Sequence, residues 1–336
     1  SDSEIILNLF YYFIEKNFNK LDNMNIINCV KKIYELCEGS FSIIIMIRDF
    51  GLISFRDKYG IRPLVYNLNK NNIIISSETC SFNENSKYNN IENGEMIIVD
   101  MNLNLKKYRL FNDELKPCIF EYIYFSSQES YINDILVYNF REKVGQKMAN
   151  IIKSSINSKL IEDVDIIVPI PLTSIISANI ISDILNKPLK YAVIKNRYTY
   201  RTFINNGKDI INNIKKIKII QELVRNKNVL LVDDSIVRGN TSKYIINELR
   251  NAGVKKIYFV SCSPPVRFPN IYGIHIPSYE ELIAHNKSNE EIKDILNLDD
   301  LFYLSLNDVL NVLKELNPKI KNFEDSTFSG NYINFK

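Results

Sequence analysis

Two adjacent carboxylates, Asp233 and Asp234, are the residues whose type and setting most clearly suggest chemistry. They follow the apolar run 229–232, which does not alternate and is therefore typical of a strand buried on both faces of a parallel sheet. Open parallel sheets bind ligands at the carboxyl ends of their strands. At that position two carboxylates can accept hydrogen bonds from the vicinal hydroxyls of a ribose, or help to hold a hydrated Mg²⁺. An Asp-Asp pair that merely ends a strand and caps a helix is the simpler alternative.

The loop after these aspartates has the composition of a phosphate-binding turn. Gly239 lets the backbone approach a ligand closely, and the helix expected next offers free N–H groups and the positive end of its dipole. Core-facing spacing over 244–249 and a stop at Gly253 define this helix, and a strand follows at 256–261. The pattern predicts a βαβ unit that binds a phosphorylated ribose through consecutive residues: Asp233, Asp234, Ser235, Ile236, Val237, Arg238, Gly239, Asn240 and Thr241.

This stretch resembles the phosphoribosyl pyrophosphate (PRPP) motif of type I phosphoribosyltransferases, and most of all that of the amidophosphoribosyltransferase family. Several separated motifs share the resemblance, in the family's order, and a set of this kind is far more specific than one motif. They lie at 56–64, 77–79, 117–122, 195–204, 272–274 and 281–284.

The resemblance implies an enzyme of purine biosynthesis that converts PRPP and ammonia, which the intact family takes from glutamine, to 5-phosphoribosylamine and diphosphate. The bond from C1 to diphosphate is largely broken in the transition state, so the reaction needs charge neutralisation, alignment and exclusion of water. It needs no strong base, because ammonia attacks as the neutral amine. The implied cofactor is Mg²⁺, near Thr173, Asp233 and Asp234. The implied catalytic lid carries Lys195, Tyr198, Arg201 and Thr202.

Two of these assignments have a structural alternative in the residues themselves. Thr173 and Ser174 follow a predicted strand, where they can cap a helix as well as contact diphosphate. The basic segment 195–204 fits a solvated loop as well as a lid, and the family resemblance favours the lid. The sequence departs from the family at Leu172, at His275 and along 210–218, where Lys215, Lys216 and Lys218 are the cations available to replace an Arg-rich stretch.

The chain is predicted to form two domains. Residues 1–112 read as helices at 4–18 and 26–37 followed by strands at 41–47, 51–55, 64–67, 73–76 and 96–99, a layered α+β unit. Residues 113–336 alternate strands and helices, with strands at 164–168 and 192–194 and a helix at 173–185, as in an α/β domain with a mainly parallel sheet and C-terminal helices. The boundary is expected between residues 108 and 117.

The first part resembles the distal portion of a class II, N-terminal-nucleophile glutamine amidotransferase domain. In that class the nucleophile is a cysteine at residue 1, and its own α-amino group is the base. Here residue 1 is Ser, and Asp2 matches the aspartate that grips the α-amino group of glutamine. The resemblance therefore implies a partial domain without its nucleophile, and we expect this chain not to hydrolyse glutamine.

A structural role, without chemistry, is predicted for Arg56, Asp57 and Arg62. These residues flank a Tyr-Gly turn between two strands, and a salt-bridged hairpin accounts for them. Ser77 and Glu78 similarly end a strand. His275 and His285 are interpreted as structural.

Bulk properties exclude several other classes. Among 336 residues, 46% are hydrophobic and 24% charged, as in an ordinary globular protein, and a net charge of +3 is too small to indicate nucleic acid. No apolar run approaches the roughly 18 residues of a membrane span. The five cysteines are scattered, so neither disulfides nor zinc are indicated, and the protein is expected to be cytoplasmic.

The family also suggests partners and alternatives. Some members carry an iron–sulfur cluster near the C-terminus, but 325–330 has no cysteine, so no cluster is expected. Homotetramers and inhibition by purine nucleotides are implied by the resemblance alone. The competing functions are a PRPP-binding regulator and a catalytically impaired pseudoenzyme.

Overall fold

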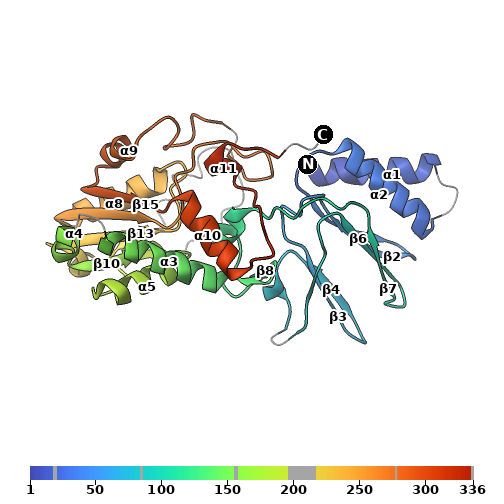
Figure 1. Ribbon diagram of the computed structural model, residues 1–336, viewed down its shortest axis with the longest axis horizontal. Helices are drawn as coiled ribbons and strands as arrows, with labels where there is room; N and C mark the ends of the chain where they lie inside the picture. The colour runs from blue at the N-terminus through green and yellow to red at the C-terminus, as the bar shows by residue number, and fades with distance from the viewer. Residues whose placement is uncertain (18–20, 84–85, 155–157, 196–216, 277, 334–336) are drawn as a thin grey trace.

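The computed structural model has two lobes side by side along its longest axis (Figure 1). It describes the whole chain except residues 18–20, 84–85, 155–157, 196–216, 277 and 334–336. The first lobe runs from α1 to β7, and the elements after β7 form the second lobe. Within the described residues, no helix is both long enough and apolar enough to cross a membrane.

Two amphipathic helices cover one face of the first lobe's larger sheet. They are α1 (Asp2–Asn17) and α2 (Asn23–Leu36), and the carboxylate of Asp22 caps α2 by accepting a hydrogen bond from the Asn25 N–H at 2.9 Å. The antiparallel sheet has the order β1-β2-β6-β7. Its strands are β1 (Ser42–Ile47), β2 (Gly51–Arg56), β6 (Glu95–Asp100) and β7 (Leu105–Arg109). Both predicted helices and the predicted strands of this sheet are confirmed to within a few residues.

A smaller antiparallel sheet lies against the other face of the first. Its strands are β4 (Ile73–Ser76), β3 (Val65–Leu68) and β5 (Asn89–Asn90), in the order β4-β3-β5. Leu64, Ile91 and Val99 belong to the apolar cluster between the sheets. The lobe is therefore layered as helices, sheet and sheet, which agrees with the predicted α+β arrangement.

A four-stranded parallel sheet organises the second lobe, as the sequence predicts. The order is β10 (Ile166–Pro169), β13 (Asn228–Asp233), β14 (Lys256–Ser261) and β15 (Asp300–Tyr303). Along β13 the side chains alternate between two separate apolar clusters and are fully buried in both. A strand of this kind must be apolar throughout, which is why the run 229–232 does not alternate.

Helices cover both faces of this sheet (Figure 1). On one face lie α3 (Val137–Ser154), α5 (Ile175–Leu185) and α10 (Leu306–Leu316), and on the other α8 (Asn240–Asn251) and α9 (Asn289–Leu296). Short elements complete the described part: the 3-10 turn Thr79–Ser81, the π-helical turn Glu121–Phe125, β8 (Tyr131–Ile132), β9 (Ile135–Leu136), α4 (Ser158–Asp163), α7 (Gln221–Val224) and α11 (Ser326–Ser329).

The strand predicted at 192–194 exists but lies outside the main sheet. It is β11 (Val193–Lys195), which pairs antiparallel with β12 (Ile217–Ile219) in a two-stranded ribbon. Local apolar composition predicts a strand, but it does not say which neighbour the strand finds.

The prediction of a salt-bridged hairpin around Arg56 is wrong about which residues form the ion pair. Arg62 forms its ion pair with Glu121, in the second lobe, with Nη1 and Oε1 2.7 Å apart. Arg56 is 1% exposed and donates to the main-chain carbonyls of Gly60 and Arg62, both at 2.7 Å. A buried guanidinium needs several acceptors at once, and the turn carbonyls supply them.

Candidate functional site

The carboxyl ends of β10 and β13 bring the predicted site residues together. These parallel strands are in register from Ile166 opposite Val229 to Pro169 opposite Val232. The Ile170 N–H then donates to the Val232 carbonyl at 2.8 Å, so the loops after the two strands leave the sheet at the same edge. This edge is where an open parallel sheet holds its ligand.

Thr173 and the two aspartates meet at this edge. The hydroxyl of Thr173 donates to Oδ2 of Asp234, and the hydroxyl of Ser235 donates to Oδ1 of Asp234 at 2.7 Å. Oδ1 of Asp233 accepts from the N–H of Asp234 at 2.9 Å. The family resemblance implies that Thr173 and Asp234 belong to one site although they are 61 positions apart, and the structure brings them into contact.

Burial sets the electrostatics of this pair. Each aspartate is 8% exposed. Burial raises the pKa of Asp233 well above its ordinary value, and the adjacent Asp234 raises it further. Burial also raises the pKa of Asp234, opposed by hydrogen bonds from Thr173 and Ser235 and by the charge of Arg141. No ion pair among the described residues includes either aspartate, so Arg141 acts on Asp234 without a direct ion pair.

This donor set fits Mg²⁺ bound together with a phosphorylated substrate. Mg²⁺ usually takes one or two carboxylates plus substrate phosphates and keeps several waters. Two aspartates and the hydroxyl of Thr173 are such a partial set. In the described part of the chain, no group of three or more His, Cys, Asp or Glu residues is arranged so that it could hold a metal ion.

The loop from Asp234 to Gly239 leads directly into α8. Gly239 has a φ of +76°, a left-handed conformation that favours glycine, and α8 starts at the next residue. A Cβ at this position would lie 2.5 Å from Cδ1 of Ile283. The turn is therefore compact, and it presents the first N–H groups of α8 at the sheet edge, where an anion is favoured.

Side chains in the predicted phosphate loop point in different directions. Ile236 is 1% exposed and packs in the cluster under α8, and Val237 packs against the cluster on the opposite face. Arg238 forms an ion pair with Glu281 and donates to the His275 carbonyl at 3.1 Å. Ligand contacts from these three residues are consequently expected from the backbone.

The other predicted residues lie in varied places. Lys195 is the exposed last residue of β11, whereas Tyr198, Arg201 and Thr202 fall outside the described residues, as do Lys215 and Lys216. Leu172 is 70% exposed beside Thr173, and its peptide bond with Pro171 is cis. Asp2 is the first residue of α1, in the first lobe.

Sequence reasoning missed Arg141, a buried cation of α3. It is 4% exposed and lines a pocket of about 10 Å³ together with Asp234, Thr173 and Cys262, which is room for about one water. One signal could have found it. Val137, Phe140, Val144 and Met148 form the core stripe of α3, and a charged residue within such a stripe usually serves a buried acceptor.

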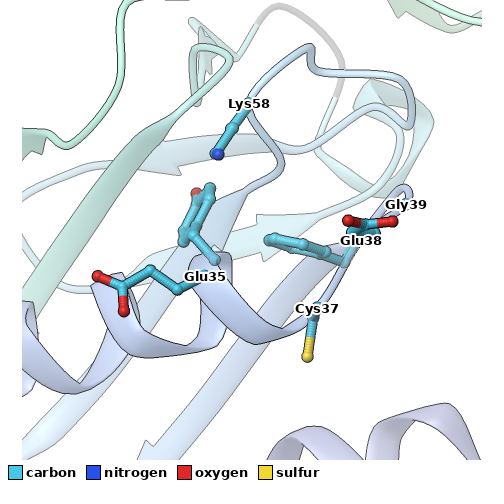
Figure 2. Close-up of a pocket in the computed structure, with 7 residues that line it drawn as sticks. Glu35, Cys37, Glu38, Gly39 and Lys58 are labelled. Carbon is cyan, nitrogen blue, oxygen red and sulfur yellow. The ribbon is translucent and has the colours of Figure 1, made fainter. Parts of the chain in front are cut away.

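A larger pocket, of about 150 Å³, lies in the first lobe at the end of α2 (Figure 2). In Figure 2 the ammonium of Lys58 points into this space, while Glu35 and Cys37 point away. Glu38 also lines it, so it has two carboxylates and one cation. This pocket lies at the C-terminal end of α2, where the negative end of the helix dipole disfavours an anion, whereas the N-terminus of α8 lies at the edge of β10 and β13. That edge is therefore the candidate site for a phosphorylated ligand.

Comparison with known proteins agrees with this geometry. Residues 139–263, which include Thr173 and the loop after β13, match the family described as phosphoribosyl transferase domain. Fold and site together define a phosphoribosyltransferase with a parallel sheet.

Proteins that align with nearly the whole chain show which phosphoribosyltransferases it is similar to. Amidophosphoribosyltransferases of Escherichia coli and Saccharomyces cerevisiae are 38% and 34% identical, each alignment covering 99% of this chain and 68% and 67% of the relative. A glutamine PRPP amidotransferase from B. subtilis, solved with ADP and GMP, superposes with a TM-score of 0.82 at 30% identity, over 99% of this chain and 70% of that one. The chain belongs to the amidophosphoribosyltransferase family, whose members are pentosyltransferases.

Proposed function

We propose that Thr173, Asp233, Asp234 and the loop 235–241 bind PRPP, and that the protein converts it, with ammonia, to 5-phosphoribosylamine and diphosphate. One observation carries this proposal: two buried aspartates, which form no direct ion pair with any described residue, lie beside a left-handed glycine turn at the start of α8. Ribose hydroxyls or a cation would stabilise the two aspartates, and a phosphate would stabilise the turn, because it accepts hydrogen bonds from the free N–H groups there.

The residues are assigned as follows. Asp233 and Asp234 accept hydrogen bonds from the ribose hydroxyls, and the backbone of 235–241 holds the 5′-phosphate. Thr173, Asp233 and Asp234 are the residues that would hold Mg²⁺, which when bound would supply positive charge beside the diphosphate. The diphosphate is covered by the lid residues Lys195, Tyr198, Arg201 and Thr202.

The two lobes are proposed to be two domains. Residues 1–112 would form part of a class II glutamine amidotransferase domain, in which Asp2 contacts the α-amino group of glutamine. Residues 113–336 would form the phosphoribosyltransferase domain with its C-terminal helices. Support for this division comes from the helices and antiparallel sheets of the first lobe and the parallel sheet of the second.

For the regulation and assembly of this chain, the proposal is based on its relatives. The B. subtilis enzyme was solved in complex with ADP and GMP, and a second solved structure, which superposes with a TM-score of 0.82, is described as the allosteric regulatory enzyme of purine biosynthesis. We propose that purine nucleotides bind and inhibit this chain, and that it acts as a cytoplasmic homo-oligomer.

The test is release of diphosphate from PRPP with ammonium and Mg²⁺, which isolates the transferase half of the reaction. Asp234→Asn is expected to lower kcat/KM by about 100-fold, because it removes a charge placed for the developing oxocarbenium ion. Asp294→Asn, an exposed change on α9 of the same lobe, is the matched control and should leave the rate unchanged. Tight PRPP binding by the wild-type chain without any diphosphate release would instead support a PRPP-binding regulator or a pseudoenzyme.

A further inference from the structure

Arg62 joins the first lobe to the second through three separate contacts. Its Nη1 lies 2.7 Å from Oε1 of Glu121, and both side chains are largely buried, at 17% and 11% exposed. Its Nε and Nη2 donate to the main-chain carbonyl of Tyr272 at 3.3 and 3.1 Å. Its guanidinium also lies over the Phe125 ring, 5.3 Å from the centroid. Ser40 strengthens the junction, because its hydroxyl donates to the same Tyr272 carbonyl at 2.7 Å.

One branch of contacts leads from Arg62 to the carboxylate pair. The second oxygen of Glu121, Oε2, accepts from the Ser126 hydroxyl at 2.9 Å, and the Ser126 carbonyl accepts from Nη2 of Arg141 at 2.8 Å. Arg141 lines the same pocket as Asp234 and acts on it electrostatically. The position of Glu121 therefore affects where the only buried cation described beside this aspartate is held.

The second branch leads to the phosphate loop through residues 270–276. Oδ1 of Asn270 accepts from the N–H groups of Tyr272 and Ile274 at 2.8 and 2.9 Å, which makes this turn compact. The carbonyl of His275, in the same turn, accepts from Nη2 of Arg238 at 3.1 Å. By binding the Tyr272 carbonyl, Arg62 therefore also fixes the turn that carries the His275 carbonyl, which is the acceptor for Arg238 of the phosphate loop.

The chain beyond this turn contacts the same loop again. The Ile283 N–H donates to the Val237 carbonyl at 3.1 Å, and Arg238 forms its ion pair with Glu281. Both branches from Arg62 consequently end on residues of 234–239.

We propose that Arg62 is a positioning residue of the phosphoribosyl site, through which the first lobe fixes the carboxylate pair and the phosphate loop in the geometry that binds PRPP. This inference rests on the proposed function, because it concerns the same site. A guanidinium is suited to the role: its planar fork can contact a carboxylate and a carbonyl at once, whereas a lysine offers a single ammonium.

The experiment compares four variants of the 336-residue chain with the wild type, by steady-state kinetics with PRPP and ammonium. Arg62→Met removes both branches and is expected to raise KM for PRPP by about fivefold or more, with a smaller change in kcat. Arg62→Lys keeps a cation beside Glu121 but loses the fork, so its KM should lie in between. Ser40→Ala removes one donor to the Tyr272 carbonyl and should raise KM about twofold. Arg48→Met, an exposed change in the β1–β2 turn of the same lobe, should change nothing.

Hydrogen exchange of the ligand-free protein gives a second readout that does not need the reaction. Amides of 234–239 and 270–276 should exchange faster in Arg62→Met than in the wild type, while those of the central strand β13 keep their protection. A role in stability alone would instead raise exchange throughout the second lobe and leave the KM of the folded protein unchanged.

The outcomes separate this inference from the proposed function. If the wild type neither binds nor consumes PRPP, the function is wrong, and exchange at 234–239 alone decides whether Arg62 positions the loop. If the wild type is active and folded Arg62→Met has the same KM and the same exchange, the positioning role is wrong. Should Arg62→Met fail to fold, Arg62→Lys and Ser40→Ala decide: wild-type KM in both overturns the inference.

Discussion

Buried carboxylates serve two different purposes in this chain. Asp57, which is fully buried, accepts backbone hydrogen bonds from Phe41, Tyr59 and Ile61 at 2.9 to 3.3 Å. Its oxygens are therefore used by the turn that follows β2. Asp233 and Asp234 instead accept from neighbours within the site itself, namely the hydroxyls of Thr173 and Ser235 and one N–H. At the scale of single residues, this difference in hydrogen-bond partners distinguishes Asp57, which stabilises a turn, from Asp233 and Asp234, which are placed to bind a ligand.

Asp57 gives a prediction for the pH dependence of stability. Burial raises its pKa from 3.8 to about 6, against the opposing charge of Arg56 and the backbone hydrogen bonds. Between these values the native state holds a proton that the unfolded state has released. The free energy of unfolding should therefore fall as the pH rises from about 4 to about 6, by an amount on the order of 3 kcal/mol, and then level off. Urea denaturation across this range measures the effect.

The comparison for Asp57 uses two substitutions. Asp57→Asn cannot titrate, so this fall should be absent from its stability profile. Asp100→Asn is the matched control: Asp100 is the last residue of β6, and hydrogen bonds from Asn104 lower its pKa, so its own contribution has the opposite sign. The fall must persist in Asp100→Asn. An identical profile for wild type and Asp57→Asn would contradict the assignment.

The residues that the sequence reveals are those whose chemistry is local. Asp233, Asp234 and Gly239 occupy one strand-loop-helix segment, so spacing alone is enough to predict their site. Arg62 and Arg141 were not predictable in this way. The partner of Arg62 lies 59 positions away, and the position of Arg141 within the core stripe of α3 indicates a buried cation but not the acceptor that it serves. The proposed lid residues Tyr198, Arg201 and Thr202 stay predictions.

At the scale of elements, strong local patterns identified the strands and helices that carry the site. The parallel strands β10, β13 and β14 and the helices α5 and α8 follow directly from apolar runs and turn residues. What these patterns cannot specify is pairing between distant segments. The ribbon of β11 and β12 is the example, because a strand of three residues has too few side chains to favour one neighbour over another.

The turn into α8 gives the second prediction, which compares the glycines that lie at the two ends of this helix. Gly239 has φ +76° and Gly253 has φ +87°, so alanine should cost about 1 kcal/mol of stability at either position. Only at Gly239 does the new Cβ lie against a neighbour, 2.5 Å from Cδ1 of Ile283, whereas at Gly253 the nearest atom is 3.5 Å away. Gly239→Ala should weaken PRPP binding at least about tenfold, since it moves the loop backbone.

Calorimetry with PRPP separates the two effects. Gly253→Ala should show the same loss of thermal stability with wild-type affinity. If both variants bind PRPP equally well, the loop at Gly239 does not approach the ligand as proposed.

At the scale of the whole molecule, the interface between the lobes is built from buried polar contacts. Arg56 of the first lobe donates through Nη1 and Nη2 to Oδ1 of Asn133, both at 3.4 Å, and Asn133 donates to the Tyr122 hydroxyl at 3.3 Å. Arg62 adds its ion pair with Glu121. Because a buried polar group that loses its partner is costly, the lobes are expected to keep one relative position and to unfold together.

Asn133 tests this expectation, and its neighbour Asp134 provides the control. Both residues occupy the β8–β9 turn with positive φ, +46° and +62°, so glycine relieves a similar backbone constraint at either position. Asn133 is 7% exposed and bonded to the buried Arg56 across the interface. Asp134 also reaches the first lobe, but the hydrogen bonds that it accepts from Tyr88 and Asn90 are exposed.

Removing the Asn133 side chain leaves the buried guanidinium of Arg56 with fewer acceptors. Asn133→Gly should lower the free energy of unfolding by about 1 to 3 kcal/mol, and Asp134→Gly should stay within about 0.5 kcal/mol of the wild type. Urea denaturation followed by hydrogen exchange gives both values and reports each lobe separately, through the strands β2 and β13. If the lobes act as one unit, both strands lose protection at the same, lowered urea concentration in Asn133→Gly. A midpoint that shifts for β2 alone would show that the contact stabilises only its own lobe, and that the two lobes unfold independently.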